Sequence, residues 1–268
     1  MFLLVPILGV AVFVLAASDM PPFRGVWLPE DISETGHVID GLFNFIMYLT
    51  GAIFVGTGIA LAWFIWKYDA AANTESVKFV HGSHTLELVW SVIPAATLLF
   101  IAIYQMDTWA GEKISRPAIL PGADNVVGTA DDSAMVEVVG RQFEWRIRYP
   151  GPDQILYTPD DLFTVNELHV PVDQQTVVSI KSDDVLHDFF LPNLRIKHDV
   201  VPGMKQFIWF TPLKTGTYDI VCAELCGWGH YKMKGRLTVE SPEKYQTWLA
   251  ELQQRQNLAE FNPAESEG

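Results

Sequence analysis

The residues best suited to metal chemistry lie close together near the C-terminal end of the chain. The segment CAELCGWGHYKM contains Cys222, Cys226, His230 and Met233, and His187 lies upstream in the sequence DDVLHD. Thiolate, thioether and imidazole ligands together suit copper, and a cysteine followed closely by a histidine and a methionine is typical of blue-copper sites. A single copper needs only one cysteine. The second cysteine therefore predicts two sulfurs that bridge two copper ions, each completed by one imidazole.

Three other interpretations of this motif explain less of it. A disulfide between the cysteines, which is common outside the cytoplasm, leaves the histidines and the methionine without a role. Zinc accepts two cysteines and two histidines but leaves the methionine unused. A catalytic thiol needs a base and a residue that orients the base, and the neighbouring residues offer no such set. Copper is therefore the metal that we expect.

The copper motif lies in a part of the chain that is rich in short strand-like runs. From residue 134 onward, seven apolar runs alternate with turn residues, which predicts an antiparallel β-sandwich or a small barrel. The runs are AMVEVVG, FEWRIRY, LHVPV, TVVSIKS, QFIWFT, GTYDIVC and GRLTVE. We assign residues 134–240 to this copper domain and residues 241–268 to a C-terminal helix and a polar tail.

The first 106 residues contain two long apolar runs. Residues 42–66 are uncharged over 25 positions, and residues 88–106 are uncharged over 19 positions with Pro94 among them. At about 1.5 Å per residue, each run is long enough to cross a hydrocarbon core about 30 Å thick. We therefore expect two transmembrane helices. The loop over residues 67–87 contains two lysines, which places it in the cytoplasm and both outer flanks on the opposite side.

The N-terminal segment MFLLVPILGVAVFVLAAS, residues 1–18, allows two interpretations. Its apolar stretch, followed by small residues, is typical of a signal peptide. It lacks the positively charged start of such peptides, so an extra membrane helix is the alternative. In either case residues 19–41 form a periplasmic lead-in to the first predicted span, and residues 107–133 form an acidic linker after the second.

The chain of 268 residues is both apolar and acidic, with 49% hydrophobic residues and a formal net charge of −14. Residues 107–268 contain 15 of the 18 basic and 24 of the 32 acidic residues, a local net charge of −9. Phosphate binding needs clustered Lys and Arg, which excludes nucleic acid as a partner of this acidic chain. A basic protein is not excluded as a partner.

Residues 121–132 and 150–161 share the pattern PGxDxxxxTxDD, which fits either a cation site or two solvated acidic turns.

Taken together, the two apolar runs, the strand-rich acidic region and the complete copper motif resemble subunit II of the cytochrome c oxidases, in the haem–copper oxidase family. The resemblance covers most of the chain. It implies an α+β membrane protein with an N-terminal transmembrane helical hairpin followed by a cupredoxin-like Greek-key β-barrel domain. It also implies a dinuclear copper A centre, in which Cys222 and Cys226 bridge two copper ions while His187 and His230 each bind one.

The resemblance assigns roles to three further residues. Met233 would be a weak thioether ligand of copper. Glu224 would offer its backbone carbonyl to copper and its side chain to a magnesium ion shared with subunit I. Glu87, in the sequence LELVWSVIP, would lie at the entrance of a proton pathway into subunit I. The alternative for Glu87 is a carboxylate that merely lies in water at the membrane surface.

The sequence departs from the family where electrons usually enter. The common stretch GHQWYW reads GRQFEW here, so Phe143 replaces the exposed first tryptophan and Trp145 matches the second. Trp228, inside the copper motif, is the other candidate for accepting electrons, although it would serve equally well as packing over the metal. Because the sequence has no CxxCH haem-attachment motif, we expect the haem donor to be a separate protein.

The resemblance implies a proton-translocating enzyme complex. The chain would accept electrons from cytochrome c or a similar donor and pass them to the haem and copper centres of subunit I, where oxygen is reduced to water. Its partners would be subunit I, the other oxidase subunits and the lipid bilayer of a bacterial inner (plasma) membrane, with the C-terminal domain in the periplasm. A basic donor would dock on the acidic face, where the candidates around His187 are Asp183, Asp184 and Asp188.

Three other classes of protein share part of this pattern. A quinol oxidase subunit II has the same architecture but lacks the copper ligands. A copper A domain of a nitrous oxide reductase has the ligands but is not normally tethered by a helical hairpin. A membrane-anchored copper carrier or assembly factor would leave Glu87 and the magnesium ligand Glu224 without a purpose.

Overall fold

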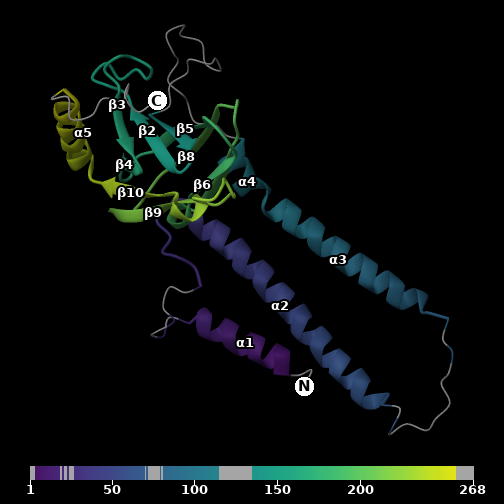
Figure 1. Cartoon of the computed structure of the whole chain (residues 1–268). Helices are drawn as coiled ribbons and strands as arrows, with labels where there is room; N and C mark the ends of the chain where they lie inside the picture. The colour runs from purple at the N-terminus through teal and green to yellow at the C-terminus, as the bar shows by residue number, and fades with distance from the viewer. Residues whose placement is uncertain are drawn as a thin grey trace. The chain divides into compact units, whose positions relative to one another are not determined.

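The chain folds into two compact units, which a computed structural model describes separately (Figure 1). One unit comprises Met1–Pro29 and Val38–Ala110, and the other comprises Glu30–His37 and Gly111–Gly268. The residues that the structure describes are 4–18, 20, 23, 27–69, 71, 79, 81–114 and 135–257. The acidic segment 121–132 and the end of the predicted polar tail lie outside the described residues.

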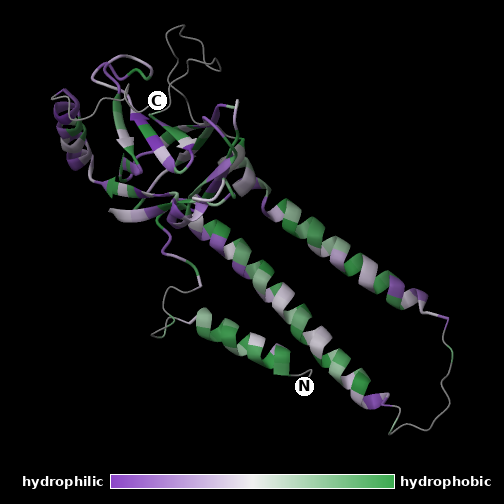
Figure 2. Cartoon of the chain, in the orientation of Figure 1, coloured by the Kyte–Doolittle hydropathy of each residue, from purple (hydrophilic) through white to green (hydrophobic). Residues whose placement is uncertain are grey.

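The first unit is helical. Its helices are α1 (Leu4–Ala16), α2 (Gly36–Lys67), α3 (His84–Tyr104) and α4 (Met106–Lys113). Both α2 and α3 are long and apolar enough to cross a membrane, and Figure 2 shows them coloured mostly green and white. Each begins before its uncharged run, because the start of a span tolerates polar residues and capping groups; Ser83 Oγ, for example, accepts a hydrogen bond from Leu86 N at the start of α3.

The short apolar helix α1 runs antiparallel to α2. The Phe13 ring meets the Tyr48 ring edge-on at 5.7 Å, and it also meets the Trp27 ring at 5.0 Å. Nearer the N-terminus, a Cβ added at Gly58 would lie 3.2 Å from the Pro6 ring, so the small residue permits close approach of the two helices. The apolar N-terminal segment of the sequence therefore forms a helix that packs on α2.

The second unit is a β-sandwich of two five-stranded sheets. Their orders are β3-β2-β1-β5-β8 and β4-β10-β9-β6-β7. The strands are β1 (Val136–Arg141), β2 (Glu144–Tyr149), β3 (Leu162–Val165), β4 (Glu167–Pro171), β5 (Thr176–Ser182), β6 (His187–Leu191), β7 (Ile196–Val200), β8 (Gln206–Phe210), β9 (Gly216–Cys222) and β10 (Lys234–Glu240). The cupredoxin-like fold class is thus confirmed. The prediction of a purely antiparallel sandwich is wrong, because β1 pairs with β5, and β4 with β10, in parallel.

Successive residues of a strand point to opposite faces of its sheet. In β2 the pattern is regular, so that Trp145, Ile147 and Tyr149 are buried between the sheets. At the end of the chain, α5 (Pro242–Asn257) covers one side of the sandwich, where Trp248 stacks on His169 with ring centroids 3.9 Å apart.

One short segment of the predicted lead-in belongs to the sandwich. Ile32 is buried in its core, and its backbone N–H donates to the Asn193 carbonyl at 3.0 Å. Its own carbonyl accepts a hydrogen bond from Leu213 N at 2.7 Å. Residues 30–37 therefore belong to the β-sandwich unit, and the last two of them already form the start of α2.

Candidate metal centre

The sheet that contains β9, β10 and β6 brings all five predicted side-chain ligands together. His187 is the first residue of β6, Cys222 is the last residue of the neighbouring β9, and Phe189 pairs with Cys222 across these strands. The β9–β10 loop starts and ends on adjacent antiparallel strands, and Cys222 N donates to the Met233 carbonyl at 3.2 Å. The loop therefore closes on itself and presents its ligands inward.

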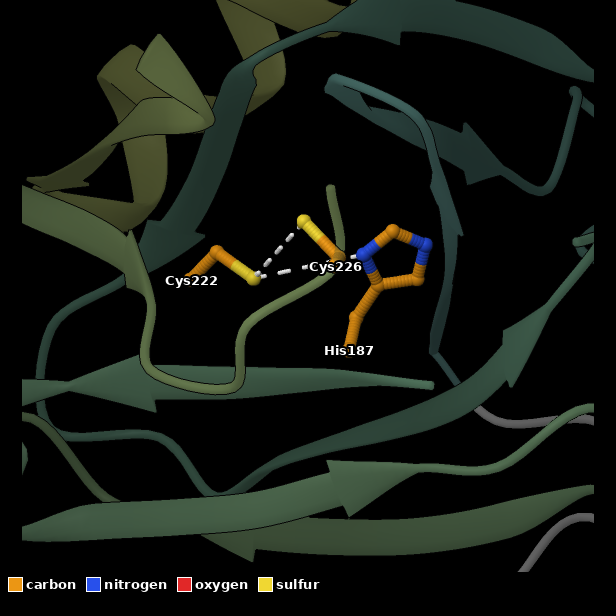
Figure 3. Close-up of side chains that lie close together, drawn as sticks. All are labelled: His187, Cys222 and Cys226. Carbon is orange, nitrogen blue, oxygen red and sulfur yellow. Dashed lines mark hydrogen bonds between the residues drawn. The ribbon is translucent and has the colours of Figure 1, made fainter. Parts of the chain in front are cut away.

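The sulfur and nitrogen atoms form a compact cluster. Cys222 Sγ lies 3.8 Å from Cys226 Sγ and 3.9 Å from His187 Nδ1 (Figure 3). Cys226 Sγ lies 3.6 Å from His230 Nδ1 and 3.8 Å from Met233 Sδ. Each thiol thus has its own imidazole, and the two thiols face each other.

The chemistry of this donor set fits copper better than its rivals. A disulfide requires the two sulfurs to lie about 2.05 Å apart, and both cysteines here are free at nearly twice that distance. Met233 is 1% exposed and directs its sulfur to the Cys226 thiol, which a zinc site would not use. Two thiolates, two imidazoles and a thioether, all within van der Waals reach, match a copper site of the copper A type.

The two thiols titrate differently. Burial alone would raise the pKa of Cys222, but hydrogen bonds with the His187 ring and with backbone groups lower it to about 7. Burial and the nearby Cys222 thiolate raise the pKa of Cys226. Around neutral pH the pair therefore retains a proton on Cys226, which a metal that binds both sulfurs must displace.

The backbone carbonyl of Glu224 also faces the cluster, where it accepts a hydrogen bond from Cys222 Sγ at 3.3 Å. The three acidic residues near His187 have different environments. Asp183 is exposed, Asp184 accepts a hydrogen bond from His187 Nε2 at 2.8 Å, and Asp188 is 3% exposed. The expectation that Asp188 helps to dock a donor is therefore wrong, because its side chain is almost completely buried.

The different environments of Asp184 and Asp188 shift their pKa values in opposite directions. Burial raises the pKa of Asp188 to about 6, despite Lys197 Nζ at 3.9 Å. Burial also acts on Asp184, but hydrogen bonds from Gln142 N, His187 and Val185 N outweigh it and lower the pKa of that carboxyl. From the sequence, we expect Asp184 among the charges of a docking face. The Asp-x-x-His spacing is the signal that could have identified its contact with His187.

The three aromatic candidates for electron acceptance differ in exposure. Trp228 is 80% exposed, and its ring meets the Phe143 ring at 5.2 Å and 70°. Trp145 is fully buried, with its ring 5.9 Å from that of His187. Trp145 therefore has no surface to offer a donor, whereas Trp228 and Phe143 form an aromatic pair that reaches the surface.

Two other predicted sites belong to other parts of the chain. Glu87 is exposed in the first turn of α3, in the helical unit. In the acidic segment 150–161, the Asp161 carboxylate accepts from Tyr157 N at 2.7 Å and faces Arg148 Nη1 at 3.3 Å. The Asp160 carboxylate accepts from Thr158 Oγ1 at 2.6 Å. Protein donors thus take these oxygens, which favours an acidic turn over a cation site.

Comparisons with known proteins all point to one family. A family model for the cytochrome c oxidase subunit II transmembrane domain matches residues 23–108, and one for its periplasmic domain matches residues 158–240. The alternative cytochrome c oxidase subunit 2 of Bradyrhizobium diazoefficiens is 30% identical over 83% of this chain and 82% of its own length. Cytochrome c oxidase subunit 2 of Thermostichus vulcanus is 30% identical over 87% of this chain and 79% of its own length.

A solved structure, the periplasmic domain of subunit II of cytochrome oxidase from Bradyrhizobium japonicum, aligns with a TM-score of 0.41 and 26% identity, covering 48% of this chain and 99% of that domain. The assignment rests on the full-length relatives, which span both the helical and the β-sandwich parts of the chain. The chain belongs to the cytochrome c oxidase subunit II family.

Proposed function

We propose that this protein is the electron-accepting subunit of a respiratory cytochrome c oxidase, and that its β-sandwich binds two copper ions. The observation that carries the proposal is the facing pair of thiols, Cys222 and Cys226, each beside its own imidazole. When bound, a copper pair of this type supplies a one-electron carrier. Family membership supports the oxidase over a nitrous oxide reductase domain or a copper carrier, because the relatives match along the membrane helices as well as the copper domain.

The residues of the chain have distinct tasks at this centre. Cys222 and Cys226 would bridge the two coppers, and His187 and His230 would each bind one. Met233 would be a weak ligand, and the Glu224 carbonyl would complete the set. Burial of four of these side chains excludes water, which keeps the ligands fixed when the charge of the centre changes. The Glu224 side chain would hold a magnesium ion together with residues of subunit I.

The proposed setting is a bacterial inner membrane. Helices α2 and α3 would span the bilayer, and the β-sandwich would lie in the periplasm, as the description of the matching family domain supports. There the protein would accept electrons from cytochrome c or a similar donor and deliver them to subunit I, where oxygen reduction is coupled to proton pumping. Other subunits of the oxidase and the lipids around α2 and α3 would complete its surroundings.

The acidic character of the C-terminal region predicts a salt-dependent encounter with the donor. Raising the ionic strength from about 0.01 M to about 0.2 M should lower kcat/KM for a basic cytochrome c at least about tenfold, because salt shortens the range of the attraction. The exposed Asp183 beside the centre contributes to this field, so Asp183→Asn should give a shallower salt dependence. Steady-state oxidation of reduced donor measures both effects. A rate indifferent to salt would rule out the acidic docking face.

A role of Glu87 in proton uptake predicts a separation between electron acceptance and turnover. In the intact complex, Glu87→Gln should slow steady-state oxygen reduction about tenfold or more, because a proton carrier is lost. Reduction of the copper centre by the donor should keep its normal rate. Asp69→Asn, another exposed carboxylate near a membrane helix end, is the matched control and should leave turnover unchanged. Normal turnover in Glu87→Gln would show that Glu87 merely lies in water.

Rapid mixing of the oxidised complex with reduced cytochrome c tests the proposed function. The absorption of the copper centre should bleach first, and reduction of the haem in subunit I should follow. Haem reduction at the normal rate while the copper absorption stays unchanged would show that electrons bypass this subunit.

A further inference from the structure

The β1–β2 turn lies directly against the metal centre. In β1, Gly140 approaches the His187 ring so closely that an added Cβ would lie 2.9 Å from His187 Cδ2. The next residues, Arg141 to Phe143, pass over the β9–β10 loop. The side-chain amide of Gln142 donates a hydrogen bond to the Cys226 carbonyl, and Gly227 leaves room for that amide, since a Cβ there would lie 2.7 Å from Gln142 Nε2.

A single carboxylate joins this turn to His187. Asp184 Oδ2 accepts a hydrogen bond from Gln142 N at 2.8 Å. Asp184 Oδ1 faces His187 Nε2 at 2.8 Å and accepts from Val185 N at 2.6 Å. Both oxygens of the Asp184 carboxylate are therefore engaged by groups of the same domain.

The contact with Asp184 determines which ring nitrogen of His187 carries the proton. An ionised carboxylate only accepts hydrogen bonds, so His187 Nε2 must be the protonated nitrogen. The Nδ1 lone pair is then free, and Nδ1 is the atom that faces Cys222 Sγ at 3.9 Å. Among the described residues, His230 has no carboxylate partner of this kind. The two imidazoles of the centre are therefore unequal.

We propose that Asp184 is the positioning residue of the metal centre: it orients His187 for copper and, through Gln142, ties this orientation to the loop that carries Cys226. The inference rests on the proposed function and extends it. Carboxylates that hold a metal-binding histidine typically contribute 10- to 100-fold to metal affinity. A negative charge on Nε2–H also stabilises the more positive, oxidised centre, so its loss should make the centre easier to reduce.

Two substitutions separate orientation from charge. Asp184→Asn removes the charge but keeps an oxygen that can accept from His187, so it should raise the reduction potential of the bound copper with little loss of copper. Asp184→Ala removes both and should weaken copper binding roughly 10- to 100-fold. The measurements are competition of the full chain in detergent against a copper chelator, and redox titration of its copper absorption. The paramagnetic resonance spectrum of each variant should differ from that of the unmodified chain.

Asp183→Asn is the matched control. It removes the same charge one residue away, from a side chain that is exposed and has no hydrogen bond or ion pair within the described part of the chain. It should leave copper affinity and reduction potential unchanged. The proposal is overturned if Asp183→Asn moves the potential as far as Asp184→Asn, or if both Asp184 variants match the unmodified chain. If the Asp184→Ala chain does not accumulate, the reduction potential of the near-isosteric Asp184→Asn variant still tests the proposal.

Failure of this inference is distinguishable from failure of the proposed function. If the unmodified chain itself binds no copper pair, the proposed function is wrong. If it binds the pair and only the Asp184 variants behave normally, the copper centre stands and the positioning role alone is rejected.

Discussion

Cys226→Ser is expected to abolish the copper pair and to lower the rate of cytochrome c oxidation roughly 100-fold or more. Cys226 Sγ contacts three of the other donors, at 3.8 Å from Cys222 Sγ, 3.6 Å from His230 Nδ1 and 3.8 Å from Met233 Sδ. Without this thiol the copper pair would lose one of its two bridging sulfurs. His230 and Met233 would then lose the metal that they share with Cys226. Residues that act as one unit lose most of their function when any essential member is removed.

The fold should survive this substitution, because serine is smaller than cysteine and the scaffold of β6, β9 and β10 does not depend on the sulfur. Met233→Leu is the matched control. It is a buried, volume-conserving change that typically costs less than about 1.5 kcal/mol of stability. It should keep two coppers and only alter the reduction potential. Copper content and paramagnetic resonance of both variants provide the readout. Two coppers and a normal rate in Cys226→Ser would contradict the proposed bridging role.

Trp228→Ala is expected to lower kcat/KM for the reduced donor about 10- to 100-fold, with copper content and resonance spectrum unchanged. Trp228 is the most exposed aromatic side chain of the metal loop, and it lies two residues from both Cys226 and His230 in sequence. Large exposed aromatic side chains commonly dominate the energy of a docking surface, and their loss costs about 2 kcal/mol or more. Its contact with Phe143 extends the aromatic surface toward the β1–β2 turn.

Tyr231→Ala is the control for Trp228. Tyr231 is also an aromatic residue of the same loop and is 67% exposed, so it tests whether any exposed ring would suffice. We expect it to change kcat/KM less than threefold. Stopped-flow reduction of the copper absorption by the donor measures both variants. A normal rate in Trp228→Ala together with a slow rate in Phe143→Ala would place electron acceptance at Phe143 instead.

The candidate ligands were predictable from the sequence because four of the five side-chain donors are encoded by residue type and short spacing. Cys222 to Met233 form one loop, and only His187 had to be brought from elsewhere. Its strand, β6, was not among the seven predicted runs, since the acidic residues before and within it mask the strand pattern. Strands β3 and β7 were missed as well, because they are short and are stabilised by their neighbours rather than by their own apolar alternation.

The surroundings of the ligands could not be predicted in the same way. The contact between Asp184 and Gln142 joins residues 42 positions apart, and no local pattern encodes it. Likewise, Ile32 enters the sandwich core from a segment that precedes the first membrane helix. Sequence spacing identifies groups that share one loop, whereas the partners that orient those groups come from tertiary packing.

The most direct test of the central claim is metal analysis combined with paramagnetic resonance on the oxidised full chain in detergent. The facing thiols Cys222 and Cys226 predict two copper ions per chain that share one unpaired electron, seen as a single signal coupled to both nuclei. One copper per chain with a signal from a single nucleus, or one zinc, would contradict the proposed copper pair.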